Sequence, residues 1–436
     1  SAYDLPLAIG ILGASEQICS DKLSDYIIMG ELSLDGSLNK IKGALPIALE
    51  AKKQGFKGII LPKCNAKEAA IVKGLEVFGA DTILDVINFF DGQDSLERTF
   101  LDIQEEFAKS LDNYEFDFID VKGQESVKRA MEVAAAGSHN ILMVGAPGSG
   151  KTMLAKRLPS ILPPLTIEEA LETTKIHSVA GRMSSFQSIV SVRPFRNPHH
   201  TISDTALVGG GSYPQPGEIS LAHNGVLFLD ELPEFKRNVL EVLRQPMEER
   251  KITIARTKQT SEYPASFMLV AAMNPCPCGY YNHPTQACTC GLGAVNKYLN
   301  KVSGPLLDRI DIQLEVVPVP FKELSTLKEG ESSEVIRKRV IEARKIQQER
   351  FKDYPDIHCN AQMNTALMKK FCKIQPSGIE LLRNVMERLG LSARAYDRIL
   401  KVARTIADIE KCENIQDAHL AEAITYRNLD RESWGR

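Results

Sequence analysis

A glycine-rich turn between an apolar run and a helix-like run constrains the fold of this chain more than any other feature. Residues 139–158 read HNILMVGAPGSGKTMLAKRL, in which ILMV is followed by the spacing G-x-x-x-x-G-K-T. In such a turn, backbone N–H groups point at phosphate oxygens, the lysine adds charge at the β and γ phosphates, and the hydroxyl ligates Mg²⁺. The pattern therefore predicts an α/β domain with a nucleotide phosphate site. The phosphate-loop residues are Gly145, Ala146, Pro147, Gly148, Ser149, Gly150, Lys151, Thr152 and Met153.

Two carboxylates follow a second apolar run. In NGVLFLDELPEF, residues 224–235, four apolar residues lead directly into Asp230 and Glu231. Because the carboxyl ends of parallel strands meet at one edge of a sheet, both side chains should lie beside the phosphate loop. Asp230 would then hold Mg²⁺ together with Thr152, and Glu231 would polarise the attacking water. The two motifs together predict an enzyme that binds ATP with Mg²⁺ and hydrolyses it.

Four of the nine cysteines lie between positions 276 and 290, in the pattern C-x-C-x9-C-x-C. Four thiolates suit a closed, tetrahedral, structural Zn²⁺ site, whereas a catalytic zinc keeps one ligand position open. The one-residue spacers are tighter than the usual spacing of roughly two to four residues, and His283 is an alternative ligand. The predicted zinc ligands are Cys276, Cys278, Cys288 and Cys290. The other cysteines are expected to be reduced thiols without a special role; they are Cys19, Cys64, Cys359, Cys372 and Cys412.

Periodicity and composition divide the chain into four segments. Residues 1–92 alternate strand-like and helix-like runs and should form a small α/β unit, whose abrupt start suggests that the chain begins inside a domain. Residues 93–116 are charged and amphipathic and predict a helical linker. Residues 117–320 hold the motifs above and end in VVPVP, whose prolines suit a domain boundary. Residues 321–436 have helical periodicity throughout and predict a helical lid.

Composition limits the class of protein. The chain has 436 residues, 43% of them apolar, and a formal net charge of -3, which favours two or three globular domains without an overall basic surface. A nucleic-acid contact would have to come from a local basic patch or from a ring of subunits. No apolar run approaches the roughly 18 to 20 residues that span a bilayer, and no secretory signal is visible. We therefore expect a cytoplasmic protein without a membrane partner.

The motifs resemble those of an AAA+ ATPase core once the strand after the carboxylate pair is included. That strand is the run FMLVAAMN, residues 267–274, which ends in Asn274. The resemblance implies that Asn274 is the sensor 1 residue, whose amide bonds the attacking water or the γ phosphate. The alternative is a strand-end asparagine that makes a turn before Pro275.

The same resemblance assigns roles to arginines near the C-terminal end of the core and in the lid. In GPLLDRIDI it implies that Arg309 is an arginine finger that reaches the nucleotide of a neighbouring subunit, and therefore that the protein is an oligomer. The alternative is local pairing of Arg309 with Asp308 or Asp311. In LSARAYDRI it implies that Arg394 is the sensor 2 residue facing the nucleotide, with Arg398 one turn further on as the weaker candidate.

Longer stretches narrow the resemblance. Residues 193–235, residues 145–166 and the cysteine loop are similar to the magnesium-chelatase-like branch of AAA+ proteins, and within it to the ComM (YifB) family over essentially the whole chain. Members of that family resemble ring-forming, ATP-driven DNA helicases that promote branch migration. The likeness implies a homohexamer that moves single-stranded, forked or junction DNA during recombination in natural transformation. The alternative is a chelatase-type motor that remodels a partner protein.

The family likeness also implies a Lon-protease-like (ribosomal S5-like) fold for the N-terminal segment, truncated at its start. Aligning residues 43–62 with the corresponding Lon segment puts Leu45 at the lysine of the catalytic dyad and places the serine position near Ala2. Ser1 is one residue away, and Lys40 and Lys42 fall in a different register. Because a hydrolase needs a base beside its nucleophile, we expect this domain to be catalytically inactive, with a structural or partner-binding role, which argues against a peptidase.

Two basic segments are candidates for DNA contacts. The run KITIARTKQTSEYPASF predicts a hairpin with Lys251, Arg256 and Lys258 near its tip, and RPFRNPHH adds Arg193 and Arg196. In a ring, copies of such loops would line a pore and contact phosphates without reading the base sequence. The alternative is a solvated hairpin with ordinary surface cations.

Overall fold

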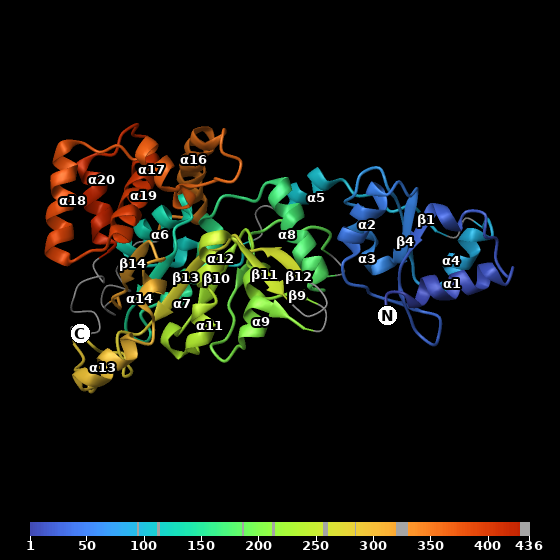
Figure 1. The fold of residues 1–436 in the computed structure, drawn as a ribbon, viewed down its shortest axis with the longest axis horizontal. Helices are drawn as coiled ribbons and strands as arrows, with labels where there is room; N and C mark the ends of the chain where they lie inside the picture. The colour runs from blue at the N-terminus through green and yellow to red at the C-terminus, as the bar shows by residue number, and fades with distance from the viewer. Residues whose placement is uncertain are drawn as a thin grey trace. The chain divides into compact units, whose positions relative to one another are not determined.

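The computed structural model divides the chain into two compact units, both drawn in Figure 1. The N-terminal unit comprises residues 1–113 and 164–192, and the C-terminal unit comprises residues 114–163 and 193–436. The structure describes residues 1–93, 96–110, 114–184, 187–211, 214–255, 260–283, 285–319 and 330–427. None of the helices in these ranges combines the length and the apolar character that a bilayer crossing needs.

The C-terminal unit is built on a five-stranded parallel sheet with the order β14-β6-β13-β10-β7. Three of its strands, β6, β10 and β13, are buried along their whole length, as expected for a parallel sheet inside an α/β fold. The strands are β6 (Ile141–Val144), β7 (Phe195–Arg196), β10 (Val226–Leu229), β13 (Met268–Met273) and β14 (Ile312–Glu315). The parallel α/β class predicted from the phosphate-loop pattern is therefore confirmed.

The strand order sets where the predicted motifs meet. Strand β6, which precedes the phosphate loop, lies between β14 and β13, and β10 pairs with the other side of β13. All these strands run in the same direction, so the segments that follow them leave from one edge of the sheet. The phosphate loop, the carboxylate pair and Asn274 therefore belong to the same edge.

Helices and two small hairpins complete the core of this unit. Helix α6 (Glu125–Gly137) is buried from Ala130 to Gly137, and α7 (Lys151–Ile161) begins directly after the phosphate loop. The hairpin predicted around residues 251–267 is formed by β11 (Lys251–Ala255) and β12 (Thr260–Pro264), which pair antiparallel. The other elements are α9 (Asp204–Val208), β8 (Gly209–Gly210), β9 (Gln215–Pro216), α10 (Glu218–Leu221), α11 (Arg237–Glu241), α12 (Arg244–Glu249), α13 (Leu292–Leu299) and α14 (Gly304–Leu307).

The C-terminal part of this unit is helical, as its periodicity predicted. Its helices, drawn in orange and red in Figure 1, are α16 (Ser333–Phe351), α17 (Thr365–Phe371), α18 (Pro376–Leu389), α19 (Ala393–Ile409) and α20 (Asp417–Thr425). Buried side chains of α16 and α19, such as Val340 and Ala403, belong to the same hydrophobic cluster as Val133 of α6 and Ile141 of β6. The helical lid and the sheet domain thus share one core.

The N-terminal unit contains a three-stranded parallel sheet with the order β1-β4-β5. Strand β1 joins this sheet through β4, whereas β2 pairs antiparallel with β3. The elements are α1 (Asp4–Ala14), β1 (Tyr26–Ile28), β2 (Glu31–Leu32), β3 (Leu38–Asn39), α2 (Ala44–Lys53), β4 (Gly58–Pro62), α3 (Lys63–Ala69), β5 (Glu76–Ala80), α4 (Ile83–Phe90), α5 (Ile103–Ser110) and α8 (Ile167–Val179).

A segment that the sequence assigned to the central block packs with the N-terminal unit. Residues 164–192, which include α8, follow α7 in the chain, yet Ala170 and Ile189 lie in the hydrophobic cluster that contains Leu45 of α2. The Ser178 carbonyl accepts a hydrogen bond from Gly43 N–H at 3.0 Å, and the Lys40 ammonium donates to the Met183 carbonyl. Sequence order could not show this, because the apolar face of α8 is buried by residues more than 100 positions away.

Candidate ATP site

The phosphate loop joins β6 to α7 and needs its glycines for two different reasons. Gly148 and Gly150 have φ values of +74° and +92°, in the left-handed region that favours glycine. Gly145 is required by space, because a Cβ there would lie only 2.2 Å from the carbonyl oxygen of Val316, which follows the neighbouring strand β14. The loop conformation is thus set both by its own residues and by the strand beside it.

Lys151 lies at the start of α7 with its ammonium directed back into the loop. Its Nζ donates to the carbonyl oxygens of Gly145 and Ala146, at 2.7 and 2.9 Å, and lies 3.3 Å from Oδ1 of Asn274. Burial lowers the pKa of Lys151, and the nearby charge of Asp230 acts in the opposite direction. The structure therefore brings Lys151 and the sensor 1 candidate Asn274 together across 123 residues of sequence.

The residues predicted to hold Mg²⁺ are also in contact. The Thr152 hydroxyl donates to Oδ2 of Asp230 at 2.6 Å, and Oδ1 of Asp230 accepts from the Glu231 N–H at 2.9 Å. A hydroxyl and a carboxylate are hard oxygen donors of the kind that Mg²⁺ prefers. The donor set at this point therefore fits a Mg²⁺ ion bound with nucleotide phosphates.

Glu231 has a partner that sequence reasoning missed. Its Oε2 lies 3.1 Å from Nδ1 of His200, and its side chain is 57% exposed. Glu231 has φ +53°, a left-handed conformation that turns it out of the end of β10. The rings of His200 and His199 are in contact, with centroids 4.1 Å apart and planes tilted by 34°. The His199-His200 pair, which follows β7, was the sequence feature that could have indicated this contact. Strand β7 lies beside β10 in the sheet, so residues that follow the two strands can meet. His200 can hold the carboxylate orientation.

Arg309 is largely buried and does not project into solvent as an arginine finger would. Its guanidinium lies 2.5 Å from Glu248 of α12 and donates to the Pro305 carbonyl at 2.6 Å, and its side chain is 9% exposed. The sequence alternatives named Asp308 and Asp311 as its partners, but the ion pair is with Glu248 instead. The Arg309 Nε has no hydrogen-bond partner among the described residues. The guanidinium is therefore held close to the core but is incompletely satisfied there.

The two sensor 2 candidates lie in different environments. Arg394 is 63% exposed and lies 3.2 Å from Asp308. Arg398 lies 3.0 Å from the fully buried Asp311, which also accepts from Asn140 N–H. Burial alone would raise the pKa of Asp311, but the charge of Arg398 and the hydrogen bond from His139 hold it below the usual range. Arg398 is thus occupied in a buried ion pair, and Arg394 is the arginine available to a ligand.

The four cysteines of the loop after β13 converge in space. The Sγ atom of Cys276 lies 3.3 Å from that of Cys278 and 3.7 Å from that of Cys288, and all four ligand atoms, including that of Cys290, lie within 4.8 Å of one another. Tetrahedral zinc, with Zn–S bonds of about 2.3 Å, needs sulfur atoms about 3.8 Å apart. The backbone hydrogen bond from Tyr280 lowers the pKa of Cys278 to about 5. Backbone hydrogen bonds act to lower the pKa of Cys288 and Cys290 as well, but burial and the neighbouring cysteines outweigh them and raise it, so the case for a metal rests on the geometry of the four sulfur atoms.

The alternative ligand His283 is engaged elsewhere, and the cysteine loop contacts the phosphate loop. Nδ1 of His283 accepts from the Gln286 N–H at 3.1 Å, which closes its own turn. Gly279 has φ +88°, and a Cβ there would lie 2.4 Å from Cδ of Pro147. The cysteine loop therefore packs tightly against the phosphate loop, so that a displacement of one loop displaces the other.

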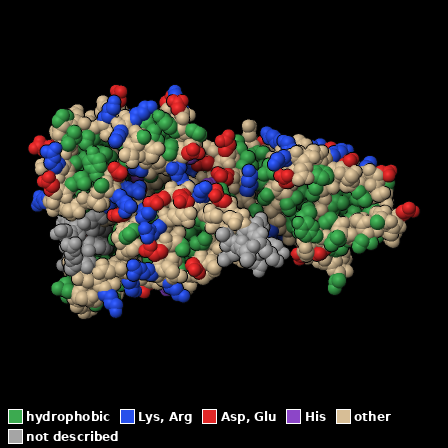
Figure 2. All heavy atoms as spheres, in the orientation of Figure 1, with side chains coloured by type: hydrophobic (Ala, Val, Ile, Leu, Met, Phe, Trp, Pro, Cys, Tyr) green, Lys and Arg blue, Asp and Glu red, His purple; other side chains and the backbone are tan. Residues whose placement is uncertain are grey.

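The predicted DNA cations are largely occupied within the unit. Arg193 donates to the carbonyls of Pro163 and Asn224, at 2.6 and 2.7 Å, and Arg196 forms two hydrogen bonds with Glu218. Lys251 pairs with Glu262 across the hairpin at 3.1 Å, and the predicted tip residues, Arg256 and Lys258, lie outside the described residues. On the face drawn in Figure 2, basic and acidic side chains are interspersed. Arg193 and Arg196 thus have structural partners, which the sequence did not anticipate.

Comparison with protein families covers most of the chain. Residues 117–324 match the family described as magnesium chelatase, subunit ChlI, and residues 330–427 match the C-terminal domain of the same subunit. Residues 1–65 match the family described as subunit ChlI of Mg-chelatase. The described phosphate loop, carboxylate pair and cysteine cluster all fall within the first of these matches.

Individual relatives are similar over nearly the full chain. YifB of Escherichia coli, described as uncharacterized, is 46% identical over 430 residues, which cover 98% of this chain and 82% of the relative. The competence protein ComM of Haemophilus influenzae is 44% identical over 436 residues, covering 98% of this chain and 83% of the relative. The magnesium-chelatase 67 kDa subunit of Chlorobaculum parvum is 25% identical over 162 residues, covering 36% of this chain and 23% of the relative.

Proposed function

This chain belongs to the family of YifB and ComM proteins, which has the domains of a magnesium chelatase subunit, and we propose that it is an ATP-hydrolysing motor that acts on DNA. The site geometry that carries the proposal is the meeting of Lys151, Thr152, Asp230 and Asn274 at one edge of the parallel sheet. These groups match the needs of phosphoryl transfer, which depends on positioning and on stabilisation of charge more than on covalent chemistry.

Each residue has a distinct role in the proposed reaction. Lys151 binds the β and γ phosphates, and it exchanges its present carbonyl partners for phosphate oxygens when nucleotide enters. Thr152 and Asp230 would hold Mg²⁺, which neutralises phosphate charge when bound. Glu231 accepts a hydrogen bond from the attacking water, and Asn274 orients that water or the γ phosphate. His200, 3.1 Å from the Glu231 carboxylate, holds that carboxylate in one orientation.

The DNA and ring parts of the proposal rest on family membership. The name of the competence protein ComM supports a role in transformation. We propose that this chain forms a homohexamer that drives branch migration. Arg309 and Arg394 would complete the nucleotide site, Arg309 from the neighbouring subunit. A chelatase-type motor that remodels a partner protein is the second candidate, because the matched family models are those of a chelatase subunit.

The first prediction separates these two candidates by the response of ATP hydrolysis to DNA. We expect at least one of single-stranded, duplex and forked DNA to raise the rate of phosphate release by the wild-type chain severalfold, since a translocating motor couples turnover to its track. The measurement is steady-state phosphate release with Mg-ATP, with each DNA and without any. Equal rates in all four reactions would contradict a DNA motor and favour the protein-remodelling alternative.

The second prediction concerns zinc, which we propose is held by the four cysteines as a structural ion. Metal analysis of the purified chain should give about one zinc per chain, and Cys276→Ser with Cys278→Ser should lose it, because two sulfur ligands are removed. Cys359→Ser with Cys372→Ser is the matched control, since these two thiols are buried outside the cluster. A stable wild-type chain without zinc, or equal zinc in both double variants, would contradict the assignment.

For the N-terminal unit we propose an inactive Lon-like domain with a structural or partner-binding role. Leu45, which the sequence places at the lysine of the Lon dyad, is fully buried in the core of the unit. Its backbone N–H donates to Glu68 at 3.0 Å. The position therefore serves packing between α2 and α3, and a lysine there would bury an ammonium among apolar side chains.

A further inference from the structure

The helical lid contains a pocket that none of the proposed ATP-site residues enters. It has a volume of about 420 Å³ and lies between α16, α17, α19 and the loop that joins α19 to α20. Five of the side chains that line it are cationic: Arg350, Lys370, Lys373, Arg404 and Lys411. Glu413 is the one acidic residue in the lining. Cationic side chains therefore outnumber acidic ones in the lining.

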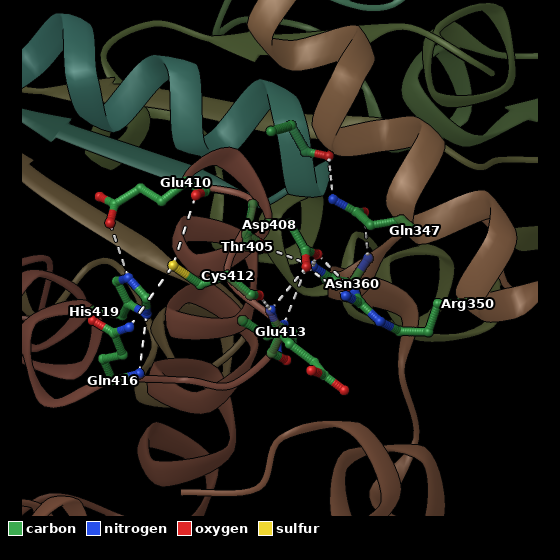
Figure 3. Close-up of polar contacts among 12 residues, drawn as sticks. Gln347, Arg350, Asn360, Thr405, Asp408, Glu410, Cys412, Glu413, Gln416 and His419 are labelled. Carbon is green, nitrogen blue, oxygen red and sulfur yellow. Dashed lines mark hydrogen bonds and ion pairs between the residues drawn. The ribbon is translucent and has the colours of Figure 1, made fainter.

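Two of the cationic side chains, Arg350 and Arg404, are largely buried and share a single carboxylate. The Arg350 and Arg404 side chains are 12% and 3% exposed, and both pair with the same carboxylate, that of the fully buried Asp408. Figure 3 shows Arg350 and Asp408 facing one another beside Asn360. Since each guanidinium remains charged in a protein and Asp408 supplies one negative charge, one positive charge is left over in the network. A buried excess of charge favours a counter-ion in the space beside it.

The remaining contacts of Arg404 do not neutralise that excess. It donates to the backbone carbonyls of Cys412 and Glu413, at 2.6 and 2.7 Å, which carry no net charge. The neighbouring thiol of Cys372 is no counter-ion either, because burial raises its pKa to about 12. The positive charge is thus built into the pocket wall.

Lysines at the opening extend the charge toward solvent. Lys370 donates to the Tyr354 hydroxyl at 3.2 Å and lies 5.0 Å from the ring centre of Phe371, and Lys373 is exposed. Within the described part of the chain, neither Lys370 nor Lys373 has a carboxylate partner closer than the 4.0 Å of an ion pair. Both ammonium groups are therefore available to an anion, whereas Lys411 is paired with Glu342 at 2.8 Å.

A metal site beside the pocket is a weaker reading of the same region. The ligand atoms of Glu410, Cys412 and His419 lie within 4.8 Å of one another. However, Nδ1 of His419 accepts the Gln416 N–H at 3.1 Å, so its ring proton belongs on Nε2, which lies 2.9 Å from Glu410. Figure 3 shows these contacts. A metal-bound histidine normally donates its other N–H, which this arrangement does not permit. His419 and Gln416 instead cap the start of α20.

We propose that the lid pocket binds phosphate groups of a DNA strand. Guanidinium and ammonium groups are the side chains that recognise phosphate, and here both kinds line one cavity. The volume falls in the range of about 300 to 1,000 Å³ that is typical of small-molecule sites, which leaves room for a nucleotide unit as well as its phosphate. DNA as the source of the phosphate rests on the proposed function, whereas the phosphate chemistry rests on the pocket alone.

The third prediction tests the pocket with the full chain, its ATP site saturated with Mg-ADP. Lys370→Gln with Lys373→Gln should weaken binding of a fluorescent single-stranded oligonucleotide. The slope of log K against log salt should fall by about 1.4, since each phosphate contact contributes roughly 0.7 for single strands. Lys345→Gln with Lys369→Gln is the matched control, because both lysines are exposed, do not line the pocket, and lie on α16 and α17. This control should retain the wild-type slope.

A second arm uses inorganic phosphate, which does not depend on DNA binding. Phosphate should raise the melting temperature of the ADP-saturated wild type and of the control, but not that of the pocket variant, since a ligand stabilises only a fold that binds it. If both double variants keep wild-type oligonucleotide binding, the pocket proposal is overturned and the DNA motor stands. If the wild type binds no DNA but phosphate still stabilises it through the pocket, the DNA source is refuted and the anion site stands. Equal phosphate stabilisation of the pocket variant and the wild type overturns the anion site.

Discussion

Lys151→Ala is expected to abolish ATP binding, whereas Glu231→Gln should bind ATP normally and hydrolyse it very slowly. Lys151 is the buried cation of the phosphate loop, and its present partners are carbonyl oxygens that phosphate would replace. Hydrogen bonds to charged groups contribute about 1.5 to 3 kcal/mol each, so losing two phosphate contacts should weaken binding by roughly 10² to 10⁴-fold. The role proposed for Glu231 is instead to prepare the attacking water, a role worth roughly 10² to 10⁴ in rate.

Two neighbouring residues supply matched controls. Lys156→Ala removes the same charge from the exposed side of α7, and Glu234→Gln removes a carboxylate three residues beyond Glu231, which pairs with Lys301 on the surface. Both controls should bind and hydrolyse ATP at nearly wild-type rates. The measurements are equilibrium binding of a fluorescent ATP analogue and phosphate release. Normal turnover by Glu231→Gln, or normal binding by Lys151→Ala, would defeat the assignment of the corresponding residue.

Arg309→Ala is expected to bind ATP almost normally yet lose roughly 10³ to 10⁵ in hydrolysis rate, the contribution of an arginine finger. Arg309 is bound to Glu248 and to the Pro305 carbonyl. To serve a neighbouring site it must leave Glu248, and its unpartnered Nε lowers the cost of doing so. The variant should therefore retain nucleotide binding while the proposed ring hydrolyses ATP slowly.

Glu248→Gln distinguishes a finger from a structural ion pair. If the importance of Arg309 lay in holding α12, both variants would lose activity to a similar degree. If Arg309 acts on phosphate, releasing it from Glu248 should leave hydrolysis intact or raise it. Steady-state phosphate release, with thermal unfolding as the check on folding, gives the answer.

Mixed rings test whether Arg309 acts across the subunit boundary. Arg309→Ala subunits combined with Glu231→Gln subunits place some intact pairs at shared interfaces, so part of the ATPase activity should return. If rings that are shown to have exchanged subunits have no more activity than either parent, two explanations remain: Arg309 acts in cis, or hydrolysis requires every site in the ring to be intact. Titration of wild type with Arg309→Ala separates those two: action in cis gives a linear loss of activity, and strict coupling gives a steep one.

The geometry of the candidate ATP site could be predicted from the sequence because its requirements are local. A phosphate loop needs glycines, a lysine and a hydroxyl at fixed spacing, and an apolar strand delivers Asp230 to the edge where ligands bind. The parallel α/β core follows from the same pattern, and the closeness of the four cysteines followed from their spacing in one short loop. The phosphate loop and the cysteine loop are each encoded within about twenty consecutive residues.

Tertiary packing decided the features that join distant parts of the chain. The partner of Glu231 is His200 rather than a neighbour in sequence, and Arg309 pairs with Glu248 rather than with an adjacent aspartate. Arg394 and Arg398, four residues apart on one helix, differ because only Arg398 meets the buried carboxylate of Asp311. Sequence spacing fixes which side chains share a helix face, but their burial and charge partners depend on the elements packed against that face. The cationic lid pocket has the same origin, because its lining comes from helices that are distant in sequence and meet only in the folded chain.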